Sequence, residues 1–334
     1  MNTPRFRLLA AFLAVYVIWG STYLGIRFAI ETIPPFLMAG ARFLVAGAIL
    51  YLWARSRGAG RPTRVNWITA AFVGFLLLIG GNGGVVWAET RIPSGLAALF
   101  IATEPFFIVL MDWLRPGGKR PKAPVILALL LGFLGVSLLV SPFELIGGGR
   151  VDLLGALAVI VASLSWAIGS LYTARGAKLP KSPMLATGME MLLGGAMFIV
   201  LASVLGEWSR FSIAAVSLKS VLAVLYLITF GAIIAFTSYV YLLKNTTPAR
   251  ASTYAYVNPV IAVFLGWALG GEELTSRALL SAAFIIAAVV TITRYQATSH
   301  TGEFPVEPPG PPPPPSTEPK PTRVIADREV TTNA

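Results

Sequence analysis

The sequence predicts an all-α polytopic membrane protein in which ten transmembrane helices form two inverted five-helix repeats. The first observation behind this prediction is composition, since 56% of the 334 residues are hydrophobic and only 12% are charged. Soluble domains carry about 25% charged residues, so most of this chain is expected to lie in lipid. The second observation is an internal repeat, and the third is the placement of the basic residues.

Motifs of the first half recur in the second half in the same order. The sequence WGSTY at 19–23 is echoed by WAIGS at 166–170, and the pattern PxLxxGxxxLxxGA begins at both Pro35 and Pro183. Nearly constant spacing indicates duplication, which is typical of transporters whose two halves rock about a shared axis. A third match consists of four residues that reappear in order: Ala97, Pro105, Val109 and Trp113, echoed by Ala251, Pro259, Val263 and Trp267.

The predicted spans follow from the apolar runs, because a helix that crosses a bilayer needs roughly 20 mostly apolar residues. Proline and glycine mark the joins between the runs. Arg5 and Arg7 precede the first run, which we interpret as an uncleaved signal anchor. The ten predicted spans are 8–28, 36–54, 67–88, 94–114, 123–141, 152–174, 183–205, 219–243, 251–269 and 277–295.

The basic residues predict the orientation of the chain. Most of the 26 Lys and Arg residues fall in loops expected on the same side of the membrane as the N-terminus, which places both termini in the cytoplasm. Since each copy has an odd number of spans, the second copy enters the membrane from the opposite side, and such inverted repeats place a binding site near the midplane. We expect three regions: a first repeat at 8–141, a second repeat at 152–296, and a Pro-rich disordered cytoplasmic tail at 297–334.

Composition also excludes several function classes. The chain has no cysteine, and its single histidine, His300, lies in the tail, which argues against thiolate metal sites, metallohydrolases and Ser-His catalysis. There is no GxxxxGK[ST] phosphate loop, so nucleotide-driven pumping within this chain is not expected. The net charge is +11, and most of the charged residues lie in short loops between apolar runs. This pattern is typical of residues that set membrane orientation rather than of a nucleic-acid-binding surface. We therefore expect no enzyme activity, no metal and no cofactor.

Three charged residues fall inside predicted spans: Arg42, Glu104 and Glu190. A charge at the centre of a span costs about 2.5–3.5 kcal/mol even by the lower estimates, so such residues are expected to face protein or water. With a rise of about 1.5 Å per residue, Glu104 lies at the midplane, whereas Arg42 and Glu190 differ in height by ~10 Å. This difference makes a direct ion pair between Arg42 and Glu190 doubtful.

We expect these three residues to form a polar ladder that faces a central cavity. Glu104 would bind a cationic group of the substrate or a proton, and Arg42 would bind a carboxylate. The alternative is a structural role, in which Arg42 pairs with Glu104 or a backbone carbonyl and Glu190 is protonated.

Glycines and prolines inside the spans predict local departures from regular helix. Gly80, Gly81, Gly83 and Gly84 surround Asn82 in the third span, and each glycine weakens a helix by about 1 kcal/mol relative to alanine. The sequence leaves two readings open: a helix break whose carbonyls and Asn82 line the cavity, or close packing through small residues. Two further dipeptides align between the repeats and predict either a hinge or a static kink: Glu104-Pro105 and Asn258-Pro259.

Aromatic residues form a further set of candidates for the substrate pathway. Trp19 and Trp166 occupy matching repeat positions well within their spans, and Tyr23 and Tyr256 lie near polar positions. Such rings can stack on cations or on aromatic metabolites. Packing within the membrane or at its interface remains the alternative for each of them.

Four motifs follow one another along the chain: WGSTY at 19–23, the stretch from Pro35 to Arg42-Phe43, PSG at 93–95 and AYVNP at 255–259. Taken in this order, they resemble the EamA-type drug/metabolite transporters, particularly bacterial inner-membrane members. The resemblance covers about residues 8–296 and includes both repeats, while the Pro-rich tail lies outside it. It implies a ten-helix bundle of two inverted EamA repeats in the bacterial cytoplasmic membrane, and export of small metabolites, often amino acids or their analogues, or of drugs.

The leading hypothesis is therefore a secondary exporter that works by alternating access through a cavity between the repeats. Its partners would be a small-molecule substrate, the lipid bilayer and, as one option for coupling, protons. Two fused repeats can enclose a pathway in one chain, so a monomer suffices, and the sequence leaves the oligomeric state open. An uncoupled facilitator or channel is the first alternative. A receptor or scaffold that signals through its tail is the second, and truncation after Ala297 would separate it from a transporter.

Overall fold

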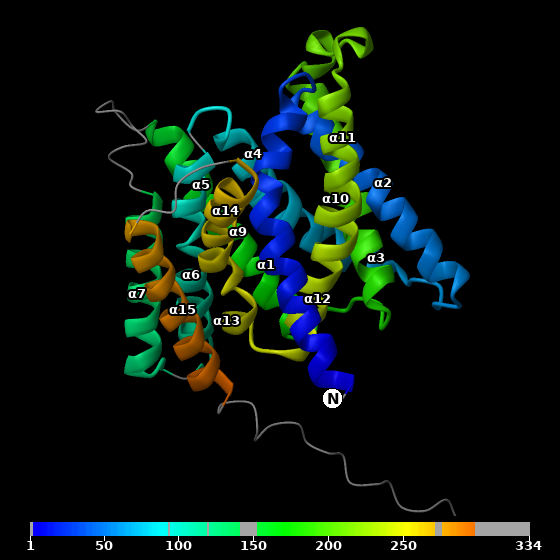
Figure 1. The fold of residues 1–334 in the computed structure, drawn as a ribbon. Helices are drawn as coiled ribbons and strands as arrows, with labels where there is room; N and C mark the ends of the chain where they lie inside the picture. Colours follow the sequence, from blue (N-terminus) through cyan, green and yellow to red (C-terminus); the bar gives the residue numbers. More distant parts are fainter. Residues whose placement is uncertain (1–2, 93, 119, 141–151, 271–275, 298–334) are drawn as a thin grey trace, which may run out of the picture. The chain divides into compact units, whose positions relative to one another are not determined.

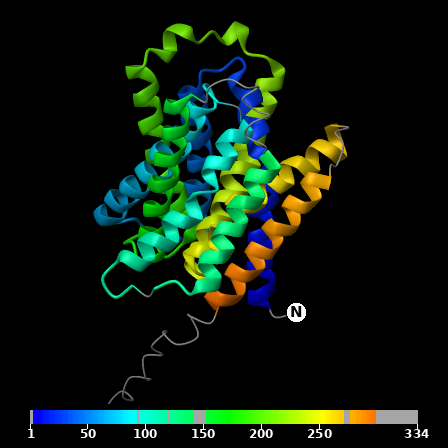
Figure 2. The ribbon, with the colours of Figure 1, turned by 90° about the vertical axis from the view of Figure 1, so that its left-hand side faces the viewer.

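The structure, a computed structural model, describes residues 3–92, 94–118, 120–140, 152–270 and 276–297. Within these ranges every regular element is a helix, and the helices pack side by side (Figure 1). The N-terminus of α1 and the C-terminal end of α15 lie at the same end of the bundle (Figures 1 and 2). Six helices are unbroken over most of a predicted span: α1 (Thr3–Ile30), α2 (Pro35–Ser56), α7 (Ala123–Val140), α9 (Leu153–Ala174), α10 (Pro183–Val204) and α15 (Ser276–Ala297).

Two further spans each contain a stretch of π-helix between α-helical segments. The third predicted span consists of α3 (Arg64–Gly74), η1 (Phe75–Gly83) and α4 (Gly84–Ala88). The eighth consists of α11 (Leu218–Tyr226), η4 (Leu227–Phe236) and α12 (Thr237–Asn245). The wider π turn is uncommon and is found mostly at functional sites. Its occurrence in corresponding spans of the two halves was not predicted from the sequence.

The fourth and ninth predicted spans are each interrupted by two residues. The fourth consists of α5 (Ser94–Ile101) and α6 (Glu104–Leu114). The ninth begins at the last residue of α13 (Pro248–Ala251) and continues as α14 (Tyr254–Gly270). The second of the two interrupting residues is a threonine in both spans, and its hydroxyl makes the same kind of hydrogen bond. The hydroxyls of Thr103 and Thr253 donate to the carbonyls of Phe100 and Arg250 at 2.6 and 2.7 Å, so each interruption keeps a polar group satisfied.

In the part of the chain that the structure describes, six helices are long and apolar enough to cross a membrane. Many outward-facing side chains on them are large and apolar, as expected for helices whose solvent is lipid. These features identify a polytopic membrane protein. The six segments are Arg5–Ile30, Pro35–Ser56, Arg64–Ala88, Leu153–Ala174, Pro183–Val204 and Leu218–Asn245, and two shorter apolar helices cover Ala123–Leu138 and Leu279–Tyr295. The predicted tail, apart from Ala297, lies outside the described residues.

Among the described residues, the most extensive contact between two helices joins the two halves of the chain through α2 and α10. A Cβ atom built on Gly47 would lie 2.7 Å from the Leu192 backbone nitrogen and 2.9 Å from the Gly188 carbonyl oxygen. A Cβ on Gly195 would lie 2.7 Å from the Leu44 backbone nitrogen. The backbones therefore touch at glycines of the repeated pattern, which leave room for no side chain. A second pair, α7 and α15, runs side by side at one edge of the bundle (Figures 1 and 2).

The first turn of α2 is capped by a residue from the other half of the chain. Pro34, which precedes the helix, makes no side-chain cap. Instead the buried Glu207 accepts hydrogen bonds from the backbone N–H groups of Phe36 at 3.3 Å and Leu37 at 2.8 Å. The first N–H groups of a helix have no partner within it, and the positive end of the helix dipole favours a carboxylate. Glu207 thus ties the segment after α10 to the start of α2.

Replacing Glu207 by alanine is expected to lower the free energy of unfolding by about 1–2 kcal/mol, because two buried N–H groups lose their acceptor. Thermal unfolding in detergent, followed by tryptophan fluorescence, measures this change. Glu31→Ala is the matched control, since Glu31 is an exposed acid that pairs with the equally exposed Lys219 at 2.7 Å. Equal midpoints for the two variants would contradict the capping role of Glu207.

Candidate functional site

A cavity of about 90 Å³ lies between helices from both halves of the chain. Its walls come from α1, α2, η1, α4, the α5–α6 junction, α9, η4 and α14. Most of the predicted site residues meet here, although they are far apart in the sequence. Those that line the cavity are Arg42, Glu104, Asn82, Asn258, Trp19, Trp166, Tyr23 and Gly81.

Two ionisable side chains of opposite type, Arg42 and Glu104, line this cavity without forming an ion pair with each other. Arg42 is 4% exposed, its Nε and Nη1 atoms have no hydrogen-bond partner, and its guanidinium lies 4.5 Å from the centre of the Phe43 ring. Glu104 is 1% exposed, and its Oε1 atom also lacks a partner. No ion pair found among the described residues includes either side chain. The cavity therefore holds unused capacity to bind both an anionic and a cationic group.

The helix interruption before α6 positions Glu104. Because α5 ends at Ile101, Glu104 becomes the first residue of α6, where the helix dipole favours a negative charge. Pro105 follows in the first turn, where its missing N–H costs nothing. The Tyr254 hydroxyl donates to the Glu104 Oε2 atom at 2.5 Å, so one carboxyl oxygen is held while the other stays free.

The aligned prolines differ in their surroundings. The interruption of the fourth span lies immediately before Glu104-Pro105, as expected if this proline starts a new helix. Pro259 lies inside α14, and the interruption of the ninth span comes earlier, at Ser252–Thr253. The backbone stays helical around Pro259, so a hinge or a static kink at this residue remains a prediction.

The amide residues add polar groups to the cavity. Asn82 lies on η1, and its Oδ1 atom is buried without a partner. When the side-chain amide of Asn258 is oriented so that its oxygen and its nitrogen both have partners, the nitrogen donates to the carbonyls of Tyr16 and Tyr254 at 3.1 Å each. The side chain of Asn258 also forms a hydrogen bond with Tyr23. Asn258 therefore links α1 to α14, while Asn82 keeps a free acceptor.

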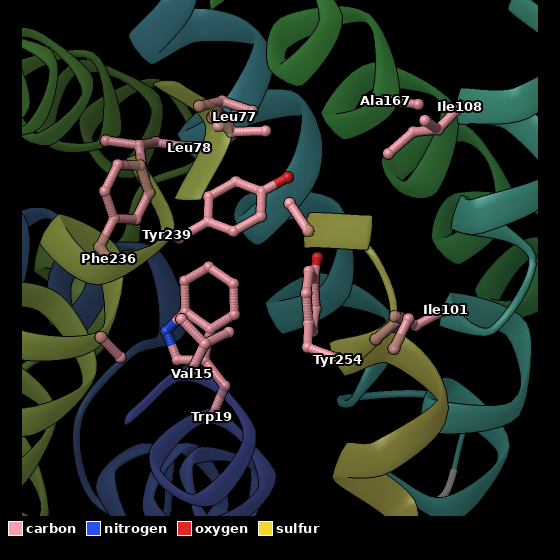
Figure 3. Packing of buried hydrophobic residues seen from close by; sticks show 14 of the residues in the cluster. Val15, Trp19, Leu77, Leu78, Ile101, Ile108, Ala167, Phe236, Tyr239 and Tyr254 are labelled. Atoms are coloured by element: carbon pink, nitrogen blue, oxygen red, sulfur yellow. The ribbon is translucent and has the colours of Figure 1, made fainter. Parts of the chain in front are cut away.

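Aromatic rings form one wall of the cavity. The ring centres of Trp19 and Trp166 lie 5.6 Å apart at 79°, an edge-to-face arrangement. Figure 3 shows Trp19 close to Tyr239 and Tyr254, whose ring centres lie 5.1 and 4.9 Å from it. The indole N–H of Trp19 donates to the Gly231 carbonyl, and that of Trp166 donates to the Tyr239 hydroxyl. The matching tryptophans therefore offer ring surface to the cavity while their polar atoms are already bonded.

Of the three residues in the predicted polar ladder, Arg42 and Glu104 line the cavity and Glu190 does not. Glu190 is fully buried on α10, its backbone carbonyl packs against Gly74 of α3, and its side chain interacts electrostatically with Lys244 of α12. Helices α2 and α10 pack antiparallel, and Gly188 of α10 lies against the backbone of Tyr51 on α2. Glu190 therefore lies roughly 9 Å along the helix pair from Arg42. The prediction that it faces the same cavity as Arg42 is wrong.

Tyr256, predicted to belong to the substrate pathway, does not line the cavity. It is fully buried elsewhere, where its hydroxyl donates to the Leu129 carbonyl and its ring fills the space beside Gly132. Of the two readings that the sequence left open for the glycines around Asn82, close packing agrees with the structure and a helix break does not, because residues 64–88 are helical throughout. A Cβ atom on any of these glycines would lie within 3.0 Å of a neighbour: Ser165 for Gly80, Trp166 for Gly81, Phe198 for Gly83 and Ala162 for Gly84.

Sequence reasoning missed two polar residues of the cavity, Thr22 and Ser163, and did not predict that Tyr254 contacts Glu104. Tyr254 holds Glu104, Thr22 lines the wall on α1, and Ser163 has a buried hydroxyl with no partner. Ser163 lies three residues before Trp166, and helix positions three apart share a face. That spacing could have identified Ser163, whereas no sequence signal joins Tyr254 to Glu104.

Comparison with known proteins shows the family. The model of the EamA-like transporter family matches residues 6–141 and again residues 153–294. The chain is 41% identical over 294 residues to the uncharacterized inner membrane transporter YedA of Escherichia coli. The matched region covers 86% of this chain and 92% of that protein. It is 24% identical to a probable amino-acid metabolite efflux pump of Escherichia coli, over 82% of this chain and 90% of the other.

The fold is also found among solved structures. One crystal structure, 21% identical in sequence, superposes with a TM-score of 0.70 and covers 87% of this chain and 98% of its own. The family match in both halves agrees with the resemblance found in the sequence motifs. This chain belongs to the EamA-like transporter family, as a multi-pass transporter of small molecules in the bacterial inner membrane.

Proposed function

We propose that this transporter exports small zwitterionic metabolites, amino acids or their analogues, through the cavity that Arg42 and Glu104 line. The observation that carries the proposal is the pair of buried, opposite charges in one cavity, each with an atom that lacks a partner. A zwitterion presents a carboxylate to the guanidinium and an ammonium to the carboxyl group. A charged guanidinium or carboxylate buried in a membrane protein is costly without a partner. The two charged groups of a zwitterionic substrate would supply the partners that Arg42 and Glu104 lack.

The size of the cavity supports a small substrate. Drug-sized ligands occupy pockets of about 300–1,000 Å³, well above the cavity volume of about 90 Å³. Export of drugs, the other substrate class that the family resemblance implies, would require a wider conformation. The name of one relative, a probable amino-acid metabolite efflux pump of Escherichia coli, favours the same substrate class.

The proposed mechanism is alternating access by ten spans arranged as two inverted repeats with both termini in the cytoplasm. The double match of the family model supports duplication, and the glycine contact of α2 with α10 joins equivalent helices. The π-helices η1 and η4 and the two interrupted spans lie in corresponding parts of the halves. These local irregularities are natural places for bending around a fixed site. A single chain contains the whole cavity, so we propose that a monomer suffices.

Profiling of released metabolites tests this function. Culture medium from cells that overproduce the chain is compared by mass spectrometry with medium from cells carrying an empty vector. Amino acids or close analogues are expected to accumulate outside only with the intact chain. Release of drugs alone, or of metabolites without charge, would contradict a zwitterion site.

Counterflow into proteoliposomes then separates an exporter from a facilitator. Vesicles are loaded with an unlabelled amino acid identified by the profiling, and entry of the labelled compound is followed. A carrier that alternates is expected to show saturable, transient accumulation of label driven by the unlabelled substrate. Entry that never exceeds equilibrium and does not saturate would favour a channel. Unchanged counterflow after truncation at Ala297 would exclude a required role for the tail.

A further inference from the structure

Glu89 is a buried carboxyl group that neither the sequence analysis nor the proposed substrate site uses. It follows Ala88, the last residue of α4, immediately after the apolar segment Arg64–Ala88. Both of its carboxyl oxygens are buried, and neither has a hydrogen-bond partner in the described part of the chain. A negative charge here would also meet the negative end of the helix dipole. Two physical effects therefore favour the protonated form.

Its position continues the wall of the cavity. Val85 lines the cavity, and the Glu89 backbone N–H donates to the Val85 carbonyl, which places the two residues one helical turn apart on one face. Tyr23 of α1 also lines the cavity, and its hydroxyl lies within electrostatic range of both Glu89 and Glu104. Glu89 thus lies one turn beyond the cavity, toward the end of the bundle where α1 finishes.

The charged groups around Glu89 leave it without a fixed counterion. From α1, the exposed Arg27 attracts the carboxylate but lies beyond ion-pair distance in the structure. In the loop after α4, Arg91 is bound to Asp152 at the start of α9 at 3.3 Å. From α2, Arg42 lines the cavity below. Burial raises the pKa of Glu89 to about 8, and Arg27 opposes this shift only in part.

We propose that Glu89 is the outer proton-binding carboxyl of the transport pathway, which exchanges protons with the extracellular side and thereby links transport to pH. The proposal rests on the proposed export function and on the orientation with cytoplasmic termini. The carboxyl group takes a proton from water outside when the pathway is open to that side. Losing the proton creates a charge at the mouth of the cavity, which Arg27 and a cationic substrate group then stabilise.

Carbodiimide labelling tests the site without any substrate. A protonated carboxyl group in apolar surroundings adds across one C=N bond of dicyclohexylcarbodiimide and forms a covalent adduct. Peptide mass spectrometry locates the modified residue. In proteoliposomes between pH 6 and 10, labelling at Glu89 is expected to fall about tenfold from pH 7 to pH 9, as a group with a pKa near 8 loses its proton. No labelling at Glu89 at pH 6 would overturn the proposal.

Transport by Glu89→Gln supplies the functional test, with the twenty common L-amino acids as probes in proteoliposomes. The unmodified chain is expected to lose transport about tenfold from pH 7 to pH 9, and Glu89→Gln is expected to lose clearly less over the same range. Glu31→Gln, an exposed acid at the same end of α1, is expected to keep the original pH profile. Glu89→Asp restores a carboxyl group and with it the pH dependence, which shows that the glutamine variant did not simply misfold.

The two hypotheses fail in different ways. If the unmodified chain transports none of the probes, the amino-acid function is wrong, and the labelling profile still decides whether Glu89 holds a proton. If the unmodified chain transports and Glu89→Gln keeps the same pH profile, the role of Glu89 is wrong and the export function stands.

Discussion

Replacing Glu104 by glutamine is expected to lower the apparent affinity for an amino-acid substrate roughly 10- to 100-fold. A hydrogen bond to a charged group contributes about 1.5–3 kcal/mol, and about 1.36 kcal/mol corresponds to a factor of ten. Glutamine keeps the shape of the side chain, and its oxygen can still accept the bond from Tyr254. The variant therefore removes the charge that would bind the substrate ammonium and leaves the packing in place.

Transport kinetics in proteoliposomes measure this effect, with thermal unfolding as the check on folding. The matched control is Glu31→Gln, because Glu31 is exposed and its partner Lys219 is exposed as well. Competition adds a sharper readout. Carboxylates without an ammonium group are expected to compete poorly with the unmodified chain and to lose less affinity than amino acids do in Glu104→Gln. An unchanged rate with unchanged pH dependence would exclude Glu104 from the pathway.

Replacing Gly47 by alanine is expected to cost about 1–3 kcal/mol of stability, the usual penalty for overpacking a close contact. The added methyl group would lie 2.7 Å from the Leu192 backbone nitrogen and 2.9 Å from the Gly188 carbonyl oxygen. Backbone atoms cannot turn aside as a flexible side chain can, so α2 and α10 must separate. That separation would also weaken the contact between the two halves of the chain.

Thermal unfolding and size-exclusion chromatography in detergent measure the loss. Gly60→Ala is the matched control, because no heavy atom lies within 4 Å of a Cβ at that position. The control is expected to change stability by less than about 0.5 kcal/mol, as for surface substitutions generally. If both variants unfold at the same temperature, the glycine contact does not hold the two halves together.

Sequence reasoning located much of the candidate site because charge in a membrane span is rare. Arg42 and Glu104 stood out on that ground alone, and the repeated tryptophans Trp19 and Trp166 stood out because duplication preserved them. All four line the cavity. The same rule misassigned Glu190, which is equally charged and equally buried, because cost in lipid does not say which neighbour a side chain faces.

Residues just outside the predicted spans escaped attention. Glu89 lies one residue beyond the predicted span 67–88, and Glu207 lies two residues beyond the span 183–205. An acid at a span end is normally solvated, so position alone gave no reason to expect burial. The structure buries both, Glu207 against the start of α2 and Glu89 beside α1, through contacts between segments far apart in the chain.

The sequence by itself determined that this chain is helical, lies in a membrane and is built from related halves. Apolar runs in lipid must satisfy their backbone groups internally, so composition dictates helices. Only the tertiary structure decided which polar groups share a cavity and which glycines serve packing rather than a break. Those outcomes depend on how helices rotate and cross, as where Tyr254 meets Glu104 and Gly188 meets Gly47. Such contacts join residues whose separation in sequence carries no record of their distance in space.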